Sequence, residues 1–212
     1  MNRRRAAITT TLAAAELVGW AMVRPPLAWA HGSEAPGSPA GRVVWPDSSG
    51  YTRTERAYAV PDVVLTDSEA RPVRLRAVLE SGEPVMVNFI FTTCGTICPV
   101  MVKVFSEVPG KLGAEAQRLR LVSISIDPEN DTPARLKAYA REHAAGPRWQ
   151  FLTGRVQDIG TIQRAFASYR GDKMNHEPVT LLHAAAGKAW VRIDGFASAA
   201  ELASEYRKVL VK

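Results

Sequence analysis

The stretch VNFIFTTCGTICPVM (Val87–Met101) decides the fold, because an apolar run passes within a few residues into two cysteines and a proline. The run PVMVNFIF is rich in Val and Phe, which is typical of a strand buried on both faces. Pro99 favours the first turn of a helix, where its missing N–H removes no intrahelical hydrogen bond. The sequence therefore predicts a central strand followed by a helix from about Pro99, with Cys94 and Cys98 at the junction.

The rest of the chain alternates strands and helices around this junction. A hairpin is expected over residues 58–75, where the turn-forming pair Asp67-Ser68 separates two extended runs. Further strands are expected at 119–126, 149–154 and on both sides of Gly187, and helices at 134–145, 156–169 and 197–212. This order predicts an α/β fold: a central mixed β-sheet flanked by helices, with an N-terminal β-hairpin extension.

The N-terminal residues have the pattern of an export signal. Arginines at positions 3–5 precede an Ala/Leu/Val-rich stretch, and Ala28-Trp29-Ala30 is an A-x-A cleavage signature. An uncleaved membrane anchor is the alternative, although Glu16 would make a membrane span costly. We therefore expect a signal peptide (or membrane anchor) at residues 1–30, a flexible Gly/Ser/Pro-rich tether at 31–50, and one folded domain at 51–212, outside the cytoplasm.

The charge distribution gives no support to nucleic-acid binding. The net charge of +6 falls to +3 when residues 1–30, with four arginines and one glutamate, are set aside. The remaining basic residues are scattered among acidic ones, with no basic run interleaved with aromatic residues. We expect a solvated, mixed surface, and membrane contact only if the leader stays uncleaved.

The two cysteines could serve as a structural disulfide, a redox couple or a pair of metal ligands. Their Cα atoms would lie about 6 Å apart in helical turns, a separation compatible with either a disulfide or chelation. A disulfide that closes so short a loop constrains little of the unfolded chain. The start of a helix favours thiolate, the form that attacks disulfides and binds soft metals. The pair therefore indicates a reactive role but leaves redox and metal binding open.

A metal site would need a third ligand, and the chain has four histidines. His31 lies on the tether, and His143 lies late in a helix, where a cation suits the helix dipole. His183 lies inside a strand and is expected to be a satisfied, half-buried residue. His176 differs, because it lies in the polar loop DKMNHEPVT that enters a strand.

Four motifs together resemble the Sco/SenC family of copper-delivery proteins, which have a thioredoxin-like fold: FTTCGTICPVM, VSISIDPENDTP, FLTG and NHEPVTLLHAAAGKAWVRIDG. The resemblance extends from about Tyr58 to the C-terminus. It implies that Cys94, Cys98 and His176 bind one copper ion, and two thiolates with an imidazole suit Cu(I) and can still hold Cu(II). It also implies that Asp127 and Asp131 lie in an acidic loop of the family. Asp131 or Thr132 is expected near the N-cap of the next helix, with Pro133 at its first position; capping is the expected role of Asp131, while Asp127 stays open as a residue near the site.

The resemblance implies a periplasmic copper chaperone. Such a protein would deliver copper to the binuclear copper site of cytochrome c oxidase or keep the thiols of that site reduced. Its partner would be the oxidase copper subunit or another periplasmic copper or thiol protein. The alternative is a periplasmic thiol-disulfide oxidoreductase in which Cys94 and Cys98 form a redox-active pair that can close to a disulfide. A peroxide-reducing enzyme is a third hypothesis, and no residue pattern favours it.

Overall fold

The apolar run that precedes the cysteines forms β4 (Val85–Ile90), and all six of its residues are buried. The computed structural model describes residues 50–211. In one eight-stranded sheet, β4 lies between β5 (Arg120–Ser125), which is parallel to it, and β7 (Val179–His183), which is antiparallel. Because a strand flanked on both sides must hide both faces, the continuous Val/Phe pattern of β4 follows from its central place.

The other strands extend the sheet in the order β1-β8-β7-β4-β5-β6-β2-β3. Only the pairs β4–β5 and β5–β6 are parallel, so the sheet is mixed, as the sequence predicted. The bounds of the remaining strands are β1 (Tyr51–Arg56), β2 (Val64–Asp67), β3 (Pro72–Arg74), β6 (Trp149–Thr153) and β8 (Trp190–Gly195).

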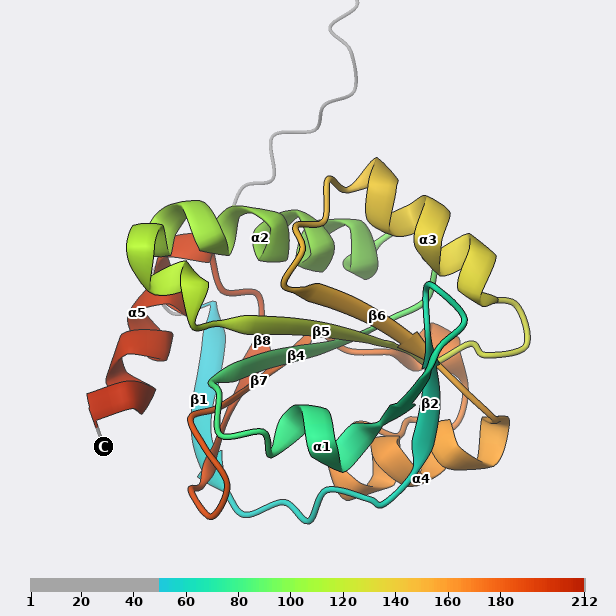
Figure 1. Ribbon diagram of the computed structural model, residues 1–212, viewed down its shortest axis with the longest axis horizontal. Coiled ribbons are helices and arrows are strands. Elements are labelled where there is room, and N and C mark those ends of the chain that lie inside the picture. The colour runs from blue at the N-terminus through green and yellow to red at the C-terminus, as the bar shows by residue number, and fades with distance from the viewer. Residues whose placement is uncertain (1–49, 212) are drawn as a thin grey trace, which may run out of the picture. The chain divides into compact units, whose positions relative to one another are not determined.

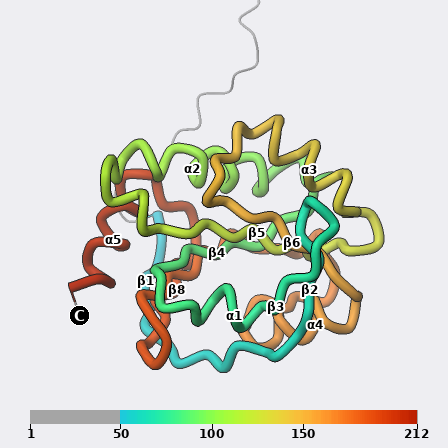
Figure 2. The backbone as a smooth tube through the Cα atoms, viewed as in Figure 1, coloured from blue at the N-terminus to red at the C-terminus, as the bar shows by residue number. Residues whose placement is uncertain are grey.

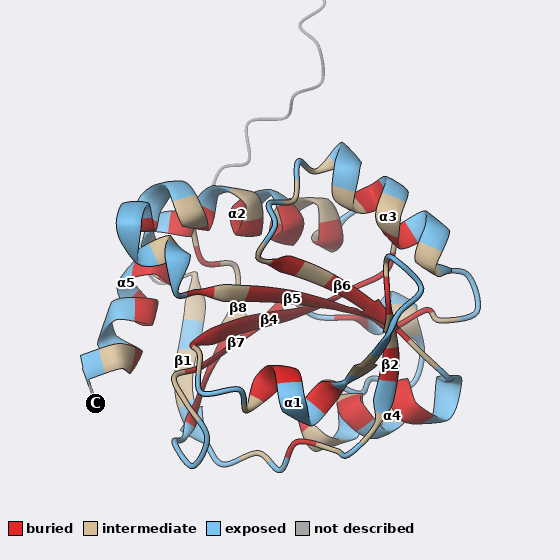
Figure 3. Ribbon diagram, in the orientation of Figure 1, coloured by how far each residue is buried: buried red, intermediate tan, exposed pale blue. Residues whose placement is uncertain are grey.

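Helices cover both faces of the sheet, as Figure 1 shows. On one face lie α2 (Ile97–Leu112) and α3 (Pro133–Glu142), with α5 (Ala199–Val211) packed against α2. On the other face lie α1 (Leu75–Leu79) and α4 (Val156–Ala165). Two short 3₁₀ helices, η1 (Gly113–Gln117) and η2 (Lys173–Asn175), complete the elements. The buried residues gather on the inner strands and on the sheet-facing sides of the helices (Figure 3).

The helix α2 shows why the sequence folds in this way. Its buried residues Met101, Val104, Phe105, Val108 and Leu112 recur at helical spacing, which places one apolar stripe against the sheet. Pro109 interrupts the stripe only near the end of the helix. The predicted α/β class, a mixed sheet with helices on both faces, is confirmed.

Among the strands and α-helices of residues 50–211, β1 and α1 were not predicted, and neither were the two 3₁₀ helices. Strand β1 has the polar sequence YTRTER and pairs only with β8, so no apolar run marks it. Instead, Arg53 of β1 donates to the buried carboxylate of Glu205 in α5, at 2.6 Å. Helix α1 has five residues, which is too short for a helical periodicity to stand out.

The predicted hairpin is present as β2 and β3, and it continues the main sheet because β2 also pairs with β6. Asp67 closes its turn by accepting hydrogen bonds from the backbone N–H groups of Glu69 and Arg71. The expected signal peptide and most of the expected tether lie outside the described residues. Within residues 50–211, none of the helices combines the length and the apolar character that a membrane crossing requires.

The carboxyl ends of β4 and β5 lie at the same edge of the sheet, because the two strands are parallel. The cysteines follow β4 at this edge, and the loop that carries Asp127 and Asp131 follows β5. Figure 2 shows the chain leaving β5 and turning into α3 near β2. The topology thus brings the two motifs to one end of the sheet.

Candidate metal centre

The loop between β4 and α2, here called the cysteine loop (Phe91–Thr96), carries Cys94. Cys94 is half-buried, and its N–H donates to the carbonyl of Phe91 at 3.1 Å. Helix α2 begins at Ile97, two residues earlier than the sequence predicted, so Cys98 lies inside its first turn and is fully buried. Both cysteines are free thiols.

The sulfur of Cys94 takes the place of a helix cap. Thr96 is the N-cap residue of α2, but its side chain accepts no capping hydrogen bond. The backbone N–H of Cys98, in the first turn, instead points at Sγ of Cys94 at 3.4 Å. A donor that helix formation leaves without a partner is therefore satisfied by the thiol, as a cap oxygen would do.

The two sulfurs have opposite acid–base character. Burial raises the pKa of Cys94, but the backbone N–H groups of Cys98 and Thr96 more than offset this, and the pKa lies below its usual value. Burial raises the pKa of Cys98 far above its usual value, and the neighbouring Cys94 raises it further. Cys94 is thus the accessible, readily ionised sulfur, while Cys98 is enclosed and protonated.

Asp131 supports the cysteine loop, which corrects its predicted role as a helix cap. Its fully buried carboxylate accepts hydrogen bonds from the N–H and the hydroxyl of Thr92 and from the hydroxyl of Ser125, the shortest at 2.6 Å. The cap of α3 is Thr132, whose hydroxyl accepts from the N–H of Arg135 at 3.3 Å. The prediction failed because the carboxylate binds a residue 39 positions upstream, whereas capping is a local interaction.

His176 lies at the end of η2, just before β7, and its ring is 7 % exposed. Its Nε2 atom is buried and has no hydrogen-bond partner among protein atoms. The ring meets the edge of Phe91, the first residue of the cysteine loop, with 6.5 Å between centroids. Burial lowers the pKa of His176, although the Phe89 carbonyl raises it, so the ring is held in the neutral form that binds metals.

The structure brings the two sulfurs together and places His176 against the same loop through Phe91. Within residues 50–211, however, no three His, Cys, Asp or Glu side chains are positioned to share one ion. The three-ligand set Cys94, Cys98 and His176 therefore stays a prediction. The donor types fit a soft metal: one sulfur with a lowered pKa, a second sulfur, and one imidazole whose buried Nε2 has no partner among protein atoms.

Two other histidines have structural roles, as the sequence indicated. Both ring nitrogens of His183 lie near carbonyl oxygens, those of Leu79 (3.2 Å) and Lys188 (3.1 Å), and its ring stacks on Trp190. His183 is more deeply buried than expected. His143 follows the last residue of α3 and packs against Tyr139. Burial lowers the pKa of His143, which opposes the expected cation. His31 lies outside the described residues.

Asp127, the first acidic residue of the loop after β5, contacts the loop of His176 directly. Its buried carboxylate accepts from Nζ of Lys173 at 2.6 Å and from the side-chain amide of Asn130. The sequence placed Asp127 near the site but gave no signal for Lys173, because the two residues are 46 positions apart.

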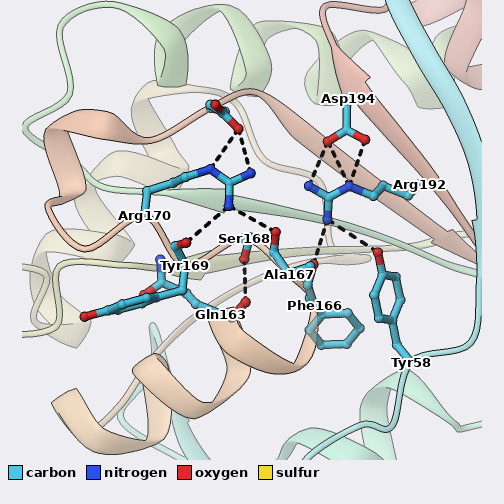
Figure 4. Close-up of polar contacts among 10 residues, drawn as sticks. Tyr58, Gln163, Phe166, Ala167, Ser168, Tyr169, Arg170, Arg192 and Asp194 are labelled. Carbon is cyan, nitrogen blue, oxygen red and sulfur yellow. Dashed lines mark hydrogen bonds and ion pairs between the residues drawn. The ribbon is translucent and has the colours of Figure 1, made fainter.

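Two arginines hold the segment between α4 and the loop of His176, as Figure 4 shows. The buried Arg192 of β8 donates to the carbonyl of Phe166 at 2.6 Å and forms an ion pair with Asp194. Arg170 donates to the carbonyls of Ala167 and Tyr169. Cations are favourable at the carbonyl end of a helix, so Arg192 stabilises the end of α4, while Arg170 holds the segment that follows it.

The mixed sheet carries a C-x-x-x-C pair at a strand-to-helix junction and a loop histidine before the adjacent antiparallel strand. These features define a thioredoxin-like thiol protein. A family model described as SCO1/SenC matches residues 52–211. The chain belongs to the SCO1/SenC family, and the resemblance drawn from its motifs is confirmed.

Among known relatives, the SCO1 protein homolog of Bacillus subtilis (strain 168) is 38% identical over 101 residues, which are 47% of this chain and 51% of the relative. The mitochondrial SCO2 homolog of Bos taurus is 33% identical over 110 residues, covering 51% of this chain and 40% of the relative. The chain thus spans about half the length, or less, of these curated relatives.

Solved structures match over a larger share of the chain. ScoI of Bradyrhizobium japonicum, solved with copper bound, has a TM-score of 0.58 and 26% identity, covering 72% of this chain and 100% of that one. The structure of BsSco has a TM-score of 0.64 and 28% identity, and the match covers 76% of this chain and 98% of that one. BsSco is described with a disulfide switch and as a member of the Sco family of cytochrome c oxidase assembly proteins.

Proposed function

We propose that this protein is a copper-delivery protein in which Cys94, Cys98 and His176 hold the ion. The observation that carries the proposal is the buried, unpartnered Nε2 of a neutral His176, held beside the loop of an ionisable thiol pair. Burying a polar atom without a partner is unfavourable, so its retention here is well explained by a ligand that it binds. Copper-bound ScoI supports copper as that ligand.

The two sulfurs would have different tasks in copper transfer. Half-buried Cys94 is the sulfur that an incoming or outgoing ion can reach, and its lowered pKa favours the thiolate that binds Cu(I). Buried Cys98 would lose its proton as the ion binds, which makes the affinity depend on pH. Oxidation of both thiols by a two-electron acceptor, such as the disulfide of another protein that is thereby reduced to two thiols, would join the sulfurs in a disulfide and remove two ligands. The redox state would then control whether copper is held.

The proposed setting is the periplasm, and the proposed partner is the copper subunit of cytochrome c oxidase, or another exported copper or thiol protein. The basic N-terminus and the Ala28-Trp29-Ala30 signature support export, and the BsSco description supports oxidase assembly. The mass of the protein isolated from the periplasm would test this, because cleavage after Ala30 would leave His31 as the first residue. An intact leader in the membrane fraction would instead indicate an anchor.

Titration of the reduced protein with Cu(I) in the presence of a competing chelator tests the site. Wild type should bind one ion tightly, and His176→Ala should bind it much more weakly. His143→Ala is the matched control, since His143 is a half-buried histidine that packs on Tyr139 at the end of α3 and is not one of the proposed ligands. Equal affinity in wild type and His176→Ala would contradict the proposed ligand set.

A thiol-disulfide oxidoreductase is the second candidate, and the opposite pKa shifts of the two cysteines favour it. In such an enzyme Cys94 would attack the disulfide of a partner, and Cys98 would then attack the mixed disulfide and release the partner in its reduced form. Cys98→Ser should therefore trap a mixed disulfide through Cys94. Absence of turnover with a protein disulfide, together with tight copper binding, would exclude this function.

A further inference from the structure

The loop that carries His176, here called the histidine loop (Arg170–Glu177), is held by an ion pair that reaches across the site. Nζ of Lys173 lies 2.6 Å from Oδ2 of Asp127, and Asp127 is 4 % exposed. A buried carboxylate requires a partner, so this pair resists opening more strongly than a surface ion pair does. It ties the histidine loop to the loop that follows β5.

Phe91 links the same lysine to the cysteine loop. The ammonium group of Lys173 lies 5.7 Å from the centroid of the Phe91 ring, within the range of a cation–π interaction. The ring of His176 meets the same aromatic ring. Lys173, His176 and the first residue of the cysteine loop therefore form one cluster around the Phe91 ring.

The ring of His176 itself contacts the carbonyl of Phe89 in β4, but this contact does not hold the backbone of the loop. The remaining contacts of the histidine loop are weaker or act within the loop. Arg170 pairs with Glu177 at 2.6 Å, but Glu177 is mostly exposed, and exposed pairs contribute little. Asp172 accepts from the N–H of Met174 and so caps η2 alone. The ion pair between Lys173 and Asp127 is thus the contact best placed to fix the histidine loop relative to the cysteines.

We propose that Lys173 is a positioning residue for His176, whose ion pair with Asp127 holds the histidine loop where His176 can join the two sulfurs around a metal ion. This inference rests on the proposed function of the site. It predicts that Lys173 contributes to copper affinity only through His176, because the lysine itself is a cation and no metal ligand.

A double-mutant cycle tests the proposal. Cu(I) affinity is measured by chelator competition for wild type, Lys173→Ala, His176→Ala and the double variant. Lys173→Ala should weaken binding about tenfold, the scale of one hydrogen bond to a charged group. In the His176→Ala background the same change should have no effect, and Lys173→Arg, which keeps the charge, should restore most of the affinity.

A matched control is available in Lys137, whose Nζ lies 2.6 Å from Glu69 and whose side chain is 39% exposed, against 35% for Lys173. Lys137→Ala should leave the affinity unchanged. In the metal-free protein, amide hydrogen exchange of residues 171–177 should accelerate severalfold in Lys173→Ala and not in Lys137→Ala.

Three outcomes are decisive. Unchanged copper affinity in Lys173→Ala would overturn the positioning role while leaving the proposed function intact. An equal loss with and without His176 would also overturn it, because Lys173 would then act on the fold or on the thiols. If wild type and His176→Ala bind copper equally, the proposed function fails and the positioning role fails with it. Faster amide hydrogen exchange of residues 171–177 in Lys173→Ala would then show only that Lys173 has a structural contact.

Discussion

Replacing Asp131 by alanine should destabilise the protein through the cysteine loop. Its carboxylate accepts three hydrogen bonds, from the N–H and hydroxyl of Thr92 and from the hydroxyl of Ser125, and it is fully buried. A hydrogen bond to a charged group contributes about 1.5–3 kcal/mol, and the three are not additive because they share one acceptor group. We expect the free energy of unfolding to fall by about 3 kcal/mol, a large part of the roughly 5–15 kcal/mol of a typical domain.

Urea-induced unfolding of the reduced protein, followed by the fluorescence of the buried residues Trp149 and Trp190, measures this change. Glu129→Ala is the matched control, because Glu129 is an exposed carboxylate of the same loop, and its effect should stay within about 0.5 kcal/mol. Asp131→Asn should fall between the two, since the amide keeps one acceptor oxygen. A loss below about 1 kcal/mol in Asp131→Ala would refute the reasoning.

Three further predictions follow from other contacts. Iodoacetamide at pH 7 should label Cys94 well before Cys98, because the pKa of Cys94 is lowered while burial raises that of Cys98; peptide mass spectrometry would detect the order, and equal labelling would contradict it. Thr132→Ala should cost about 1 kcal/mol of unfolding free energy, since it removes the cap of α3, with the exposed Thr161→Ala as the control. Burial raises the pKa of Glu205, but hydrogen bonds from Lys208 and Arg53 more than offset this, and the pKa in the folded state lies below the ordinary value of 4.5. The ionised carboxylate therefore contributes fully to the free energy of unfolding above pH 4.5, and this contribution is lost as the pH falls through the lower folded-state pKa. Glu205→Gln should therefore be less stable at pH 7 and lose less stability on acidification; parallel pH profiles would contradict this.

The sequence predicted those parts of the fold whose signal is local. The central strands β4, β5 and β7 appear as largely apolar runs, most continuous in β4, because nearly all of their residues are buried. Strand β1 has no such run, since it lies at an edge and is held partly by the ion pair of Arg53 with Glu205. A charged residue that is satisfied by a distant partner looks in the sequence like any surface residue.

In the candidate site, too, local relations could be predicted from the sequence and contacts between distant residues could not. The proximity of Cys94 and Cys98 could be predicted, because they lie four positions apart at a helix start. The role of Asp131 was predicted wrongly, and Lys173 was missed, because their partners lie 39 and 46 positions away. Such pairs depend on the parallel order of β4 and β5 and on the return of the chain through β7, which no local pattern encodes.

The loop after β5 carries two anchors four residues apart. Asp127 binds the histidine loop, and Asp131 binds the cysteine loop. The N–H of Asp131 also donates to the carbonyl of Asp127 at 2.8 Å, which fixes the distance between the two carboxylates. This short segment therefore sets the separation between the histidine loop and the cysteine loop, whose candidate ligands are about 80 positions apart along the chain. One residue inserted between Asp127 and Asp131 would shift the histidine relative to the thiols without altering any proposed ligand, so the length of this loop is as much a part of the site as the ligands are.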